Sequence, residues 1–254
     1  MEVDGKVIVV TGATSGIGRA TAEVLASHGA SVMVAGRNAG AAAEVVAAIT
    51  DAGGVAGASL GDVADPAFAE RLIVSTVVEY GRVDAVVNAA GVIVRAGATE
   101  TSDEDFAWVM KVNVTGTFNV SRAAVRAMRE TGGGAIVNVS STCGLVGTKG
   151  MVAYCASKGA VTLMTQAMAL DHASEGIRVN AVCPGAVDTP MLRSGRDADP
   201  LSDDAILASN LASIPQGRVP DASEVAELIA FLVSDASAHI VGAAIPIDGG
   251  YVAQ

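Results

Sequence analysis

Short apolar runs recur along the chain, and within each run hydrophobic residues follow one another without alternating with polar ones. This pattern is typical of parallel strands covered by helices on both faces, because both faces of such a strand need apolar side chains. We predict strands at Lys6–Thr11, Ser31–Ala35, Val55–Leu60, Val83–Asn88, Ala135–Ser140, Ile177–Val182 and Ala243–Ile247.

Segments with helical character separate these strands. We predict helices at Gly16–His28, Ala39–Asp51, Pro66–Tyr80, Asp103–Glu130, Met151–Ser174 and Ala222–Ser234, with an interruption of the fourth near Asn113–Thr117. Alternating strands and helices predict a single α/β domain over residues 1–254. Its expected core is a Rossmann-like, doubly wound parallel sheet of about seven strands with helices on both faces.

The segment Asp188–Asp204 does not fit this alternation. It holds Pro190, Gly195 and Pro200 among charged residues, with few apolar ones. Such a composition is typical of a surface loop. We expect a mobile flap that closes over a bound substrate, extending to about residue 207.

Composition narrows the possible partners. Hydrophobic residues make up 51% of the 254 residues and charged residues 17%, which excludes a disordered chain and allows a large buried core. The formal net charge of −11, with no basic stripe, argues against nucleic-acid binding. No apolar run approaches the roughly 20 residues of a transmembrane helix, and Met1–Lys6 does not resemble a signal peptide. We expect a cytoplasmic protein with no membrane partner.

The cysteines and histidines lack the spacing of metal ligands. There is no CxxC pair, and no histidine is placed at a ligand-like distance from a cysteine or from another histidine. We therefore expect no metal site. The thiols, at Cys143, Cys155 and Cys183, are expected to be free, as in a reducing cytoplasm.

A glycine-rich turn, Thr11–Gly18, joins the first predicted strand to the first predicted helix. Gly12 permits the tight turn, Gly16 lets the backbone approach a pyrophosphate, and Gly18 lets the helix pack closely on the strand. The N–H groups and the dipole at the start of the helix favour a bound anion. No Lys follows the last glycine, which disfavours a P-loop, so the turn indicates dinucleotide binding.

Tyr154 and Lys158 lie four residues apart in a predicted helix, so their side chains share one face. An ammonium group beside a phenol favours the phenolate and should lower the pKa of Tyr154 toward neutral. Such a residue suits a general acid in ketone reduction or a general base in alcohol oxidation. Ser141 ends a predicted strand, at the edge of the sheet where ligands bind, and can hydrogen bond a substrate oxygen. Its neighbour Ser140 is the rival for that role.

Taken in order, these motifs resemble the short-chain dehydrogenase/reductase family over essentially the whole chain. Thr11–Gly18 is similar to the TGxxxGxG turn of that family, Asp62-Val63 to its adenine-contacting pair, and Asn88–Gly91 to its NAG motif. The four residues that stand where the family has its catalytic residues are Asn113, Ser141, Tyr154 and Lys158.

The resemblance implies an NAD(P)-dependent enzyme that moves a hydride between a nicotinamide dinucleotide and a carbonyl or alcohol substrate. It implies that Lys158 bonds the nicotinamide ribose and that Asn113 supports Lys158 through water in a proton relay. The residues implied to contact the cofactor are Gly12, Thr14, Ser15, Gly16, Ile17, Gly18, Arg37, Asp62, Val63, Asn88, Ala89, Gly91, Tyr154, Lys158, Pro184, Gly185, Val187 and Thr189. The residues expected to contact the substrate are Ser141, Cys143, Met151, Tyr154 and Met191.

The end of the second predicted strand bears on the choice of cofactor. An NAD-specific site places an acidic residue there, and this chain has Gly36 followed by Arg37. No carboxylate opposes a 2′-phosphate, and the guanidinium of Arg37 can pair with one. Ser15 stands where many NADP-preferring relatives have a second basic residue. We predict NADP(H), with NAD(H) as the alternative.

The residues that flank the catalytic positions are apolar or small: Val94, Cys143, Leu145, Val146, Met151, Val187, Met191 and Leu192. They favour a largely apolar ketone or secondary alcohol over a sugar or a phosphate. One alternative is a 3-oxoacyl-thioester (acyl-carrier-protein) reductase, for which Arg122, Arg126 and Arg129 offer a docking patch, although arginines near a helix end are equally expected. Another is a non-catalytic dinucleotide-binding sensor, which the four retained catalytic residues disfavour.

Two helical segments carry apolar residues on more than one face, which indicates contacts with other subunits. These residues are Val109, Val112, Val120 and Val125 in Asp103–Glu130, and Val161, Leu163, Met164 and Met168 in Met151–Ser174. The family that the chain resembles pairs these helices across two-fold axes. A homotetramer is expected.

Overall fold

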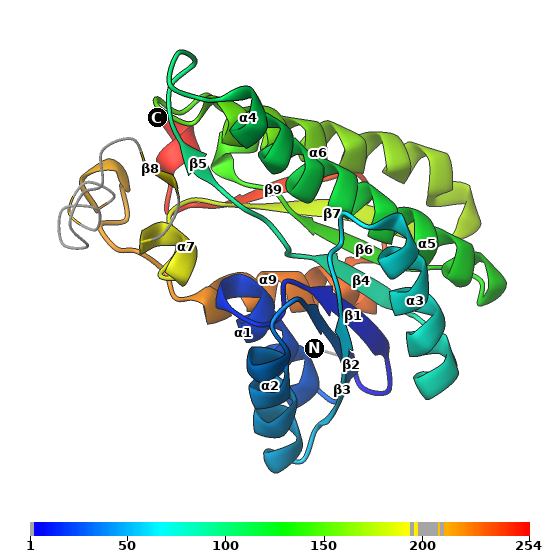
Figure 1. The fold of residues 1–254 in the computed structure, drawn as a ribbon. Helices are drawn as coiled ribbons and strands as arrows, with labels where there is room; N and C mark the ends of the chain where they lie inside the picture. The colour runs from blue at the N-terminus through cyan, green and yellow to red at the C-terminus, as the bar shows by residue number, and fades with distance from the viewer. Residues whose placement is uncertain (1–2, 194–195, 198–207, 209–210) are drawn as a thin grey trace.

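A computed structural model describes residues 3–193, 196–197, 208 and 211–254 of the chain. Seven parallel strands form one sheet in the order β3-β2-β1-β4-β6-β7-β9 (Figure 1). The strands are β1 (Val7–Thr11), β2 (Ser31–Gly36), β3 (Val55–Leu60), β4 (Ala85–Asn88), β6 (Gly134–Val139), β7 (Ile177–Pro184) and β9 (Ala244–Ile247). The predicted Rossmann-like sheet of about seven strands is confirmed.

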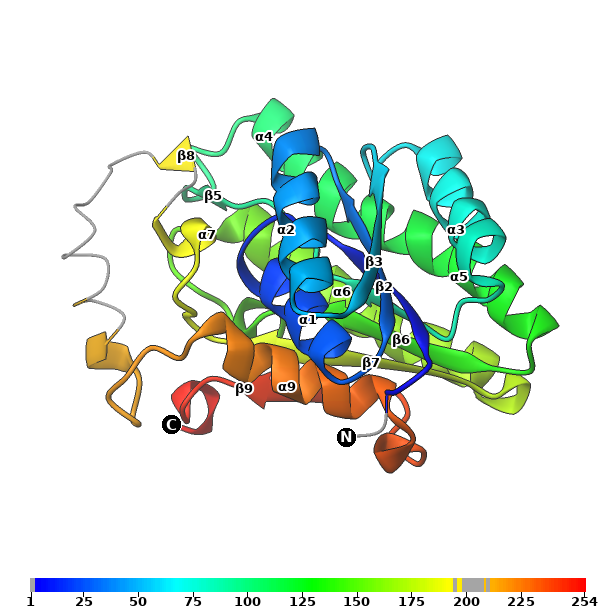
Figure 2. The ribbon, with the colours of Figure 1, turned by 90° about the horizontal axis from the view of Figure 1, so that it is seen from below.

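Helices cover both faces of this sheet (Figures 1 and 2). One face carries α1 (Gly16–Ser27), α2 (Ala39–Asp51) and α9 (Ala222–Val233); the other carries α3 (Pro66–Tyr80), α5 (Thr117–Glu130) and α6 (Val152–His172). Each face has its own apolar core, one built around Leu25, Val45 and Ile229 and the other around Leu72, Met128 and Met168. Burial of these side chains is the main stabilising contribution. No helix in the described ranges is long and apolar enough to span a membrane.

The predicted helices and strands begin and end within two residues of the observed ones, but not every strand is buried on both faces. The edge strand β3 leaves Val55 51% and Leu60 49% exposed. The expectation of coverage on both faces is therefore wrong for β3, which lies at the edge of the sheet.

The interruption predicted near Asn113–Thr117 is a π-helix rather than a break. The helix α4 (Asp103–Met110) continues through a π-helix at Lys111–Gly116 directly into α5. A π turn accommodates one extra residue without ending the helix, and such turns occur frequently at functional sites.

A small second sheet was not predicted. The two-residue strands β5 (Val94–Arg95) and β8 (Arg196–Asp197) pair in parallel, next to the short helix α7 (Pro190–Arg193) (Figure 1). β8 and α7 belong to the segment expected to form a flap. Residues 194–195 and 198–207 of that segment lie outside the described residues, so the expected closure stays a prediction.

Most of the apolar residues predicted to face other subunits are buried inside the protomer. Of the eight named above, only Leu163 and Met164 are not buried. The prediction is wrong for the other six because α4, α5 and α6 pack against the sheet or against one another along more than one stripe. Other large apolar side chains are exposed on these helices, among them Phe106, Phe118 and Leu170.

Candidate active site

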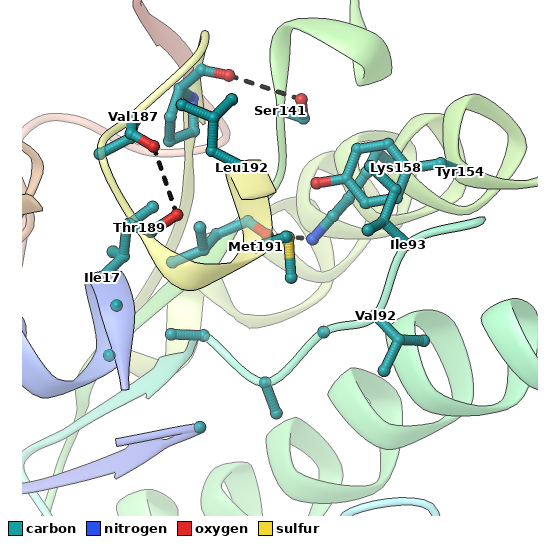
Figure 3. A pocket seen from close by; sticks show the side chains of 18 of the residues that line it. Ile17, Val92, Ile93, Ser141, Tyr154, Lys158, Val187, Thr189, Met191 and Leu192 are labelled. Atoms are coloured by element: carbon teal, nitrogen blue, oxygen red, sulfur yellow. Dashed lines mark hydrogen bonds between the residues drawn. The ribbon is translucent and has the colours of Figure 1, made fainter. Parts of the chain in front are cut away.

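A cleft of about 560 Å³ opens along the edge of the sheet where the parallel strands have their carboxyl ends. Its walls come from the segments that follow β1, β2, β3, β4, β6 and β7, together with α7 and the C-terminal turn at Tyr251. Figure 3 shows the part of this cleft around Tyr154 and Lys158. Open parallel sheets bind ligands at this edge.

The glycine-rich turn forms one wall, and its glycines are required by close contacts. A Cβ at Gly12 would lie 2.7 Å from the Cα of Ala90, and a Cβ at Gly18 would overlap the carbonyl oxygen of Gly12. Gly12 and Gly16 also have positive φ angles. The first turn of α1 receives no hydrogen bond from the side chain of Ser15, whereas α2 and α3 are capped by Asn38 and Asp65. This backbone fits the phosphates of a dinucleotide.

The end of the cleft beyond β2 and β3 holds Gly36, Arg37, Asp62 and Val63. A Cβ at Gly36 would lie 2.6 Å from Cγ2 of Thr14, so a larger residue here would require the side chain of Thr14 to move. Arg37 is exposed. Asp62 accepts a hydrogen bond from the N–H of Ala64 (2.9 Å), which fixes the turn after β3.

Tyr154 and Lys158 project from the first two turns of α6 into the cleft and are 8% and 5% exposed (Figure 3). The Lys158 Nζ lies 5.6 Å from the centre of the Tyr154 ring and donates a hydrogen bond to the carbonyl oxygen of Val139 (2.7 Å). This bond connects α6 to the carboxyl end of β6. The two side chains share one face of the helix, as the sequence predicted.

Burial sets the protonation of both residues. Desolvation raises the pKa of Tyr154 above its usual value, while the hydroxyl of Ser141 and the charge of Arg95 act in the opposite direction. Desolvation lowers the pKa of Lys158 to about 8. The expectation that Lys158 lowers the pKa of Tyr154 is therefore wrong in this structure, because burial outweighs any charge that Lys158 provides. Tyr154 is protonated at neutral pH.

The contacts of Ser140 and Ser141 distinguish the two hydroxyls. Ser140 donates a hydrogen bond to the carbonyl oxygen of Lys158 (3.0 Å) and shares one with Thr162 (2.8 Å), so its hydroxyl anchors the chain after β6 to α6. The Ser141 hydroxyl lies in the cleft, donates to the carbonyl oxygen of Pro184 (3.4 Å) and accepts from the N–H of Cys143 (3.1 Å). Ser141 is the hydroxyl better placed to meet a ligand.

Asn113 does not line the cleft. Its side chain exchanges two hydrogen bonds with the backbone of Val92 (2.8 and 2.9 Å) and donates a third to Ser157 (3.0 Å). A Cβ at Gly91 would lie 3.4 Å from Oδ1 of Asn113 and 3.6 Å from Nζ of Lys158, so these two groups approach the same point. The amide of Asn113 fixes the wall of the cleft at Val92.

Asn88 is also outside the cleft, although it was expected to contact the cofactor. Its Nδ2 donates to Ser121 (2.9 Å) and to Oδ1 of Asn138 (2.8 Å), and Nδ2 of Asn138 donates to Thr165 (2.8 Å). These residues form a buried polar chain that connects β4 and β6 to α5 and α6. The side chain of Asn88 does not reach the cleft because, at the last position of β4, it points to the α5 face rather than to the carboxyl edge.

The remaining predicted contacts with the cofactor and the substrate all line the cleft. Of the other apolar residues expected there, Val187 and Leu192 line it, whereas Val94 is buried in a separate small core and Leu145 and Val146 are exposed outside it. Sequence reasoning missed several lining residues, which are Val92, Ile93, Arg95, Val112, Thr148, Ile214 and Tyr251. Of these residues, only Tyr251 could have been suspected from the sequence, because the Gly249-Gly250 pair before it indicates a turn after β9.

Comparison with known proteins agrees with this geometry. A family model described as enoyl-(acyl carrier protein) reductase matches residues 12–252. The chain is 42% identical over 250 residues to cis-4-hydroxycyclohexanecarboxylate dehydrogenase of Sinomonas cyclohexanicum, covering 98% of this chain and 97% of the other. It is 37% identical over 251 residues to the 3-oxoacyl-[acyl-carrier-protein] reductase of Escherichia coli, covering 98% of each.

The chain belongs to the short-chain dehydrogenase/reductase family. Two solved structures of similar proteins superpose closely on it. A short-chain type dehydrogenase/reductase from Mycobacterium marinum has a TM-score of 0.92 and 35% identity, covering 99% of this chain and 97% of the other. A candidate NAD(P)-dependent gluconate 5-dehydrogenase from Beutenbergia cavernae, with NADP bound at low occupancy, has a TM-score of 0.91 and 38% identity, covering 99% and 98%. As a member of this family, the protein is an NAD(P)-binding oxidoreductase.

Substituting Lys158 should reveal the stability cost of its charge. With a pKa of about 8 in the folded chain and about 10.5 when free, Lys158 is protonated below pH 8 in both states and destabilises the fold there. That cost is relieved as the pH rises from 8 to 10.5, because the folded state then binds fewer protons than the unfolded state. Removing the charge should stabilise the folded chain by about 3 kcal/mol, and leaving the carbonyl of Val139 unpaired should cost about 1 kcal/mol. We therefore predict that Lys158→Met raises the free energy of unfolding by about 2 kcal/mol at pH 7.

Urea denaturation at fixed protein concentration, at pH 7 and at pH 10.5, measures this difference. The advantage of the variant should shrink at the higher pH while its catalytic activity is lost at both. Equal or lower stability of Lys158→Met at pH 7 would contradict the assignment.

Proposed function

We propose that the protein catalyses the NADP(H)- or NAD(H)-dependent interconversion of a largely apolar ketone and a secondary alcohol, with Tyr154 as the general acid/base. The observation that carries this proposal is the placement of two buried ionisable groups, Tyr154 and Lys158, in the same cleft as the glycine-rich turn. When bound, the nicotinamide dinucleotide supplies or accepts the hydride.

The residues of the chain would then divide the remaining work. Tyr154, which burial keeps protonated, donates its proton to the oxygen of a ketone, and Ser141 hydrogen bonds the same oxygen. Lys158, fixed by its bond to the carbonyl of Val139, would donate hydrogen bonds to the nicotinamide ribose of the bound cofactor. Asn113 acts indirectly, by fixing the backbone at Val92 beside Lys158.

The part of the cleft near Tyr154, called the substrate lobe below, favours a substrate with an apolar body. Apolar side chains that line the cleft together with Tyr154 include Ile93, Met151, Met191 and Leu192. Figure 3 shows Ile93 beside the Tyr154 ring and Met191 near the Lys158 ammonium. An apolar lobe of this kind excludes water and favours a ring or an alkyl chain over a polyhydroxylated compound. The name of the Sinomonas relative describes a ring alcohol that also carries a carboxylate, so it supports the ring and the secondary alcohol.

The alternative, an acyl-carrier-protein reductase, is supported by the Escherichia coli relative but not by the expected docking patch. Arg126 is paired with Glu70 (2.6 Å), Arg129 with Glu175 (2.7 Å), and the guanidinium of Arg122 lies over the ring of Phe118. Two of the three charges are thus neutralised within the chain. A non-catalytic sensor is the less favoured alternative, because Tyr154, Lys158 and Ser141 all meet in one cleft.

A turnover screen tests this function. Absorbance of the reduced nicotinamide would be followed with cyclic and linear alcohols, ketones, a 3-oxoacyl thioester and gluconate. We expect the highest kcat/KM with an apolar secondary alcohol or its ketone.

Tyr154→Phe should lower kcat at least a hundredfold, because the proton donor is removed, while the affinity for the cofactor is retained. Near-normal turnover by this variant, or turnover of polyhydroxylated acids alone, would refute the proposal.

We further propose that NADP(H) is the preferred cofactor. Gly36 leaves no carboxylate to repel a 2′-phosphate. Arg37 follows on the cleft wall, and no other residue in the described part of the chain forms an ion pair with it. Its guanidinium is available to a phosphate.

Arg37→Ala tests this preference with its own internal control. The variant should lose at least tenfold in kcat/KM with NADP(H), because it loses the phosphate partner, and change less than threefold with NAD(H). The measurement is steady-state kinetics with each cofactor at saturating substrate. A wild-type preference for NAD(H), or unchanged NADP(H) efficiency in Arg37→Ala, would show that the assignment is wrong.

We also propose a cytoplasmic homotetramer. Leu163 and Leu170 on α6 are 67% and 83% exposed, and Phe106 and Phe118 are exposed on α4 and α5, where other subunits can cover them. The three unbridged cysteines support a reducing compartment.

Light scattering at micromolar concentration should give about four times the 25.2 kDa of one chain. Leu170→Glu should reduce that mass, and a monomeric wild type would contradict the proposal.

A further inference from the structure

Arg95 lies on the short strand β5, in the segment that leaves the carboxyl end of β4, and its side chain lines the cleft. Its Nη2 donates hydrogen bonds to the carbonyl oxygens of Met191 (2.8 Å) and Leu192 (3.2 Å), almost a hundred residues later in the chain. Both carbonyls belong to α7, whose last carbonyl groups have no partner within so short a helix. A guanidinium at this end of a helix provides donors and a favourable charge together.

The residues that Arg95 holds form part of the cleft wall. The side chains of Met191 and Leu192 point into the cavity near Lys158 and Tyr154 (Figure 3). Val92 and Ile93, on the segment that leads into β5, form another part of the wall. The segment around Arg95 is also paired with residues that follow α7. In the parallel pairing of β5 with β8, Val94 lies opposite Arg196 and Arg95 opposite Asp197.

We infer that Arg95 is a positioning residue of the active site, which holds α7 against β5 and thereby sets the shape of the substrate lobe. The inference rests on the proposed function for its kinetic consequences, but the tether itself is a property of the fold. Neither the glycine-rich turn nor the catalytic residues require an arginine at this position. An arginine here holds the part of the cleft wall formed by Met191 and Leu192.

The charge of Arg95 has a second consequence. The groups that act on the pKa of Tyr154 are Ser141 and Cys143 after β6, Cys155 on α6 and Arg95 on β5, and Nζ of Lys158 lies 5.6 Å from the centre of the ring. Burial raises the pKa of Tyr154, and Arg95 acts against that rise. Removing the positive charge should raise the pKa further. For alcohol oxidation, which needs Tyr154 to accept a proton, the rising limb of the pH profile should move to higher pH.

Two variants separate the tether from the charge. Arg95→Met removes both, and Arg95→Lys keeps the charge on a side chain one bond shorter, whose ammonium does not reach the position of Nη2 between the two carbonyls. Arg71→Gln, an exposed arginine on α3, is the control. We expect Arg95→Met to raise KM for the alcohol at least tenfold, to shift the rising limb to higher pH, and to leave the cofactor dissociation constant within twofold. Arg95→Lys should restore the pH profile but not KM, and the control should behave as wild type.

Hydrogen–deuterium exchange of the peptide that covers residues 188–193 provides a readout that needs no turnover. Exchange there should be at least tenfold faster in Arg95→Met than in wild type and unchanged in Arg71→Gln. If no alcohol or ketone is turned over, the proposed function fails while this measurement still decides the tether. Wild-type exchange and KM in Arg95→Met, full recovery of KM in Arg95→Lys, or an equal loss of cofactor affinity would each overturn the inference.

Discussion

The parallel arrangement of the strands is the constraint on which the rest of the structure depends. Parallel strands place all their carboxyl ends on one edge, so segments that are far apart in the chain meet there without any long loop. The glycine-rich turn after β1 and the serine after β6 are about 130 residues apart and still line one cleft. Close approach at this edge demands small residues, as Gly12 shows where it meets Ala90 in the segment after β4.

Polar contacts, in addition to the apolar packing of α6 on the sheet, fix the first turns of α6 to this edge. Lys158 donates to the carbonyl of Val139 with its side chain and accepts from Ser140 with its backbone, so α6 and the end of β6 are connected in both directions. Beneath them, Asn138 links β6 to Asn88 on the neighbouring strand and to Thr165 on α6. Buried polar groups are costly without partners, so these hydrogen bonds restrict how α6 and the strands can be arranged; within the described residues, Oδ1 of Asn88 has no hydrogen-bond partner.

The sequence predicted the fold well because its periodicity reports burial directly, and it predicted that Tyr154 and Lys158 lie together because a spacing of four residues fixes a shared helix face. It failed for features that depend on tertiary packing. The direction in which Asn88 points, at the end of β4, is set by the sheet register and not by its motif. The pKa of Tyr154 depends on burial, which the spacing to Lys158 does not report. β5 and β8 are too short to produce a periodicity, so Arg95 was missed.

The π-helix at Lys111–Gly116 makes the length of this region as important as its composition. One additional residue in the turn rotates α4 by about 100° relative to α5. That rotation lets Asn113 face Val92 and Ser157 while Val120, Ala124 and Met128 of α5 still face the sheet. A one-residue deletion here would restore a regular helix and turn one of these two faces away from its partners. Insertions and deletions between Asp103 and Glu130 are therefore constrained more tightly than substitutions on the exposed side of the same helices.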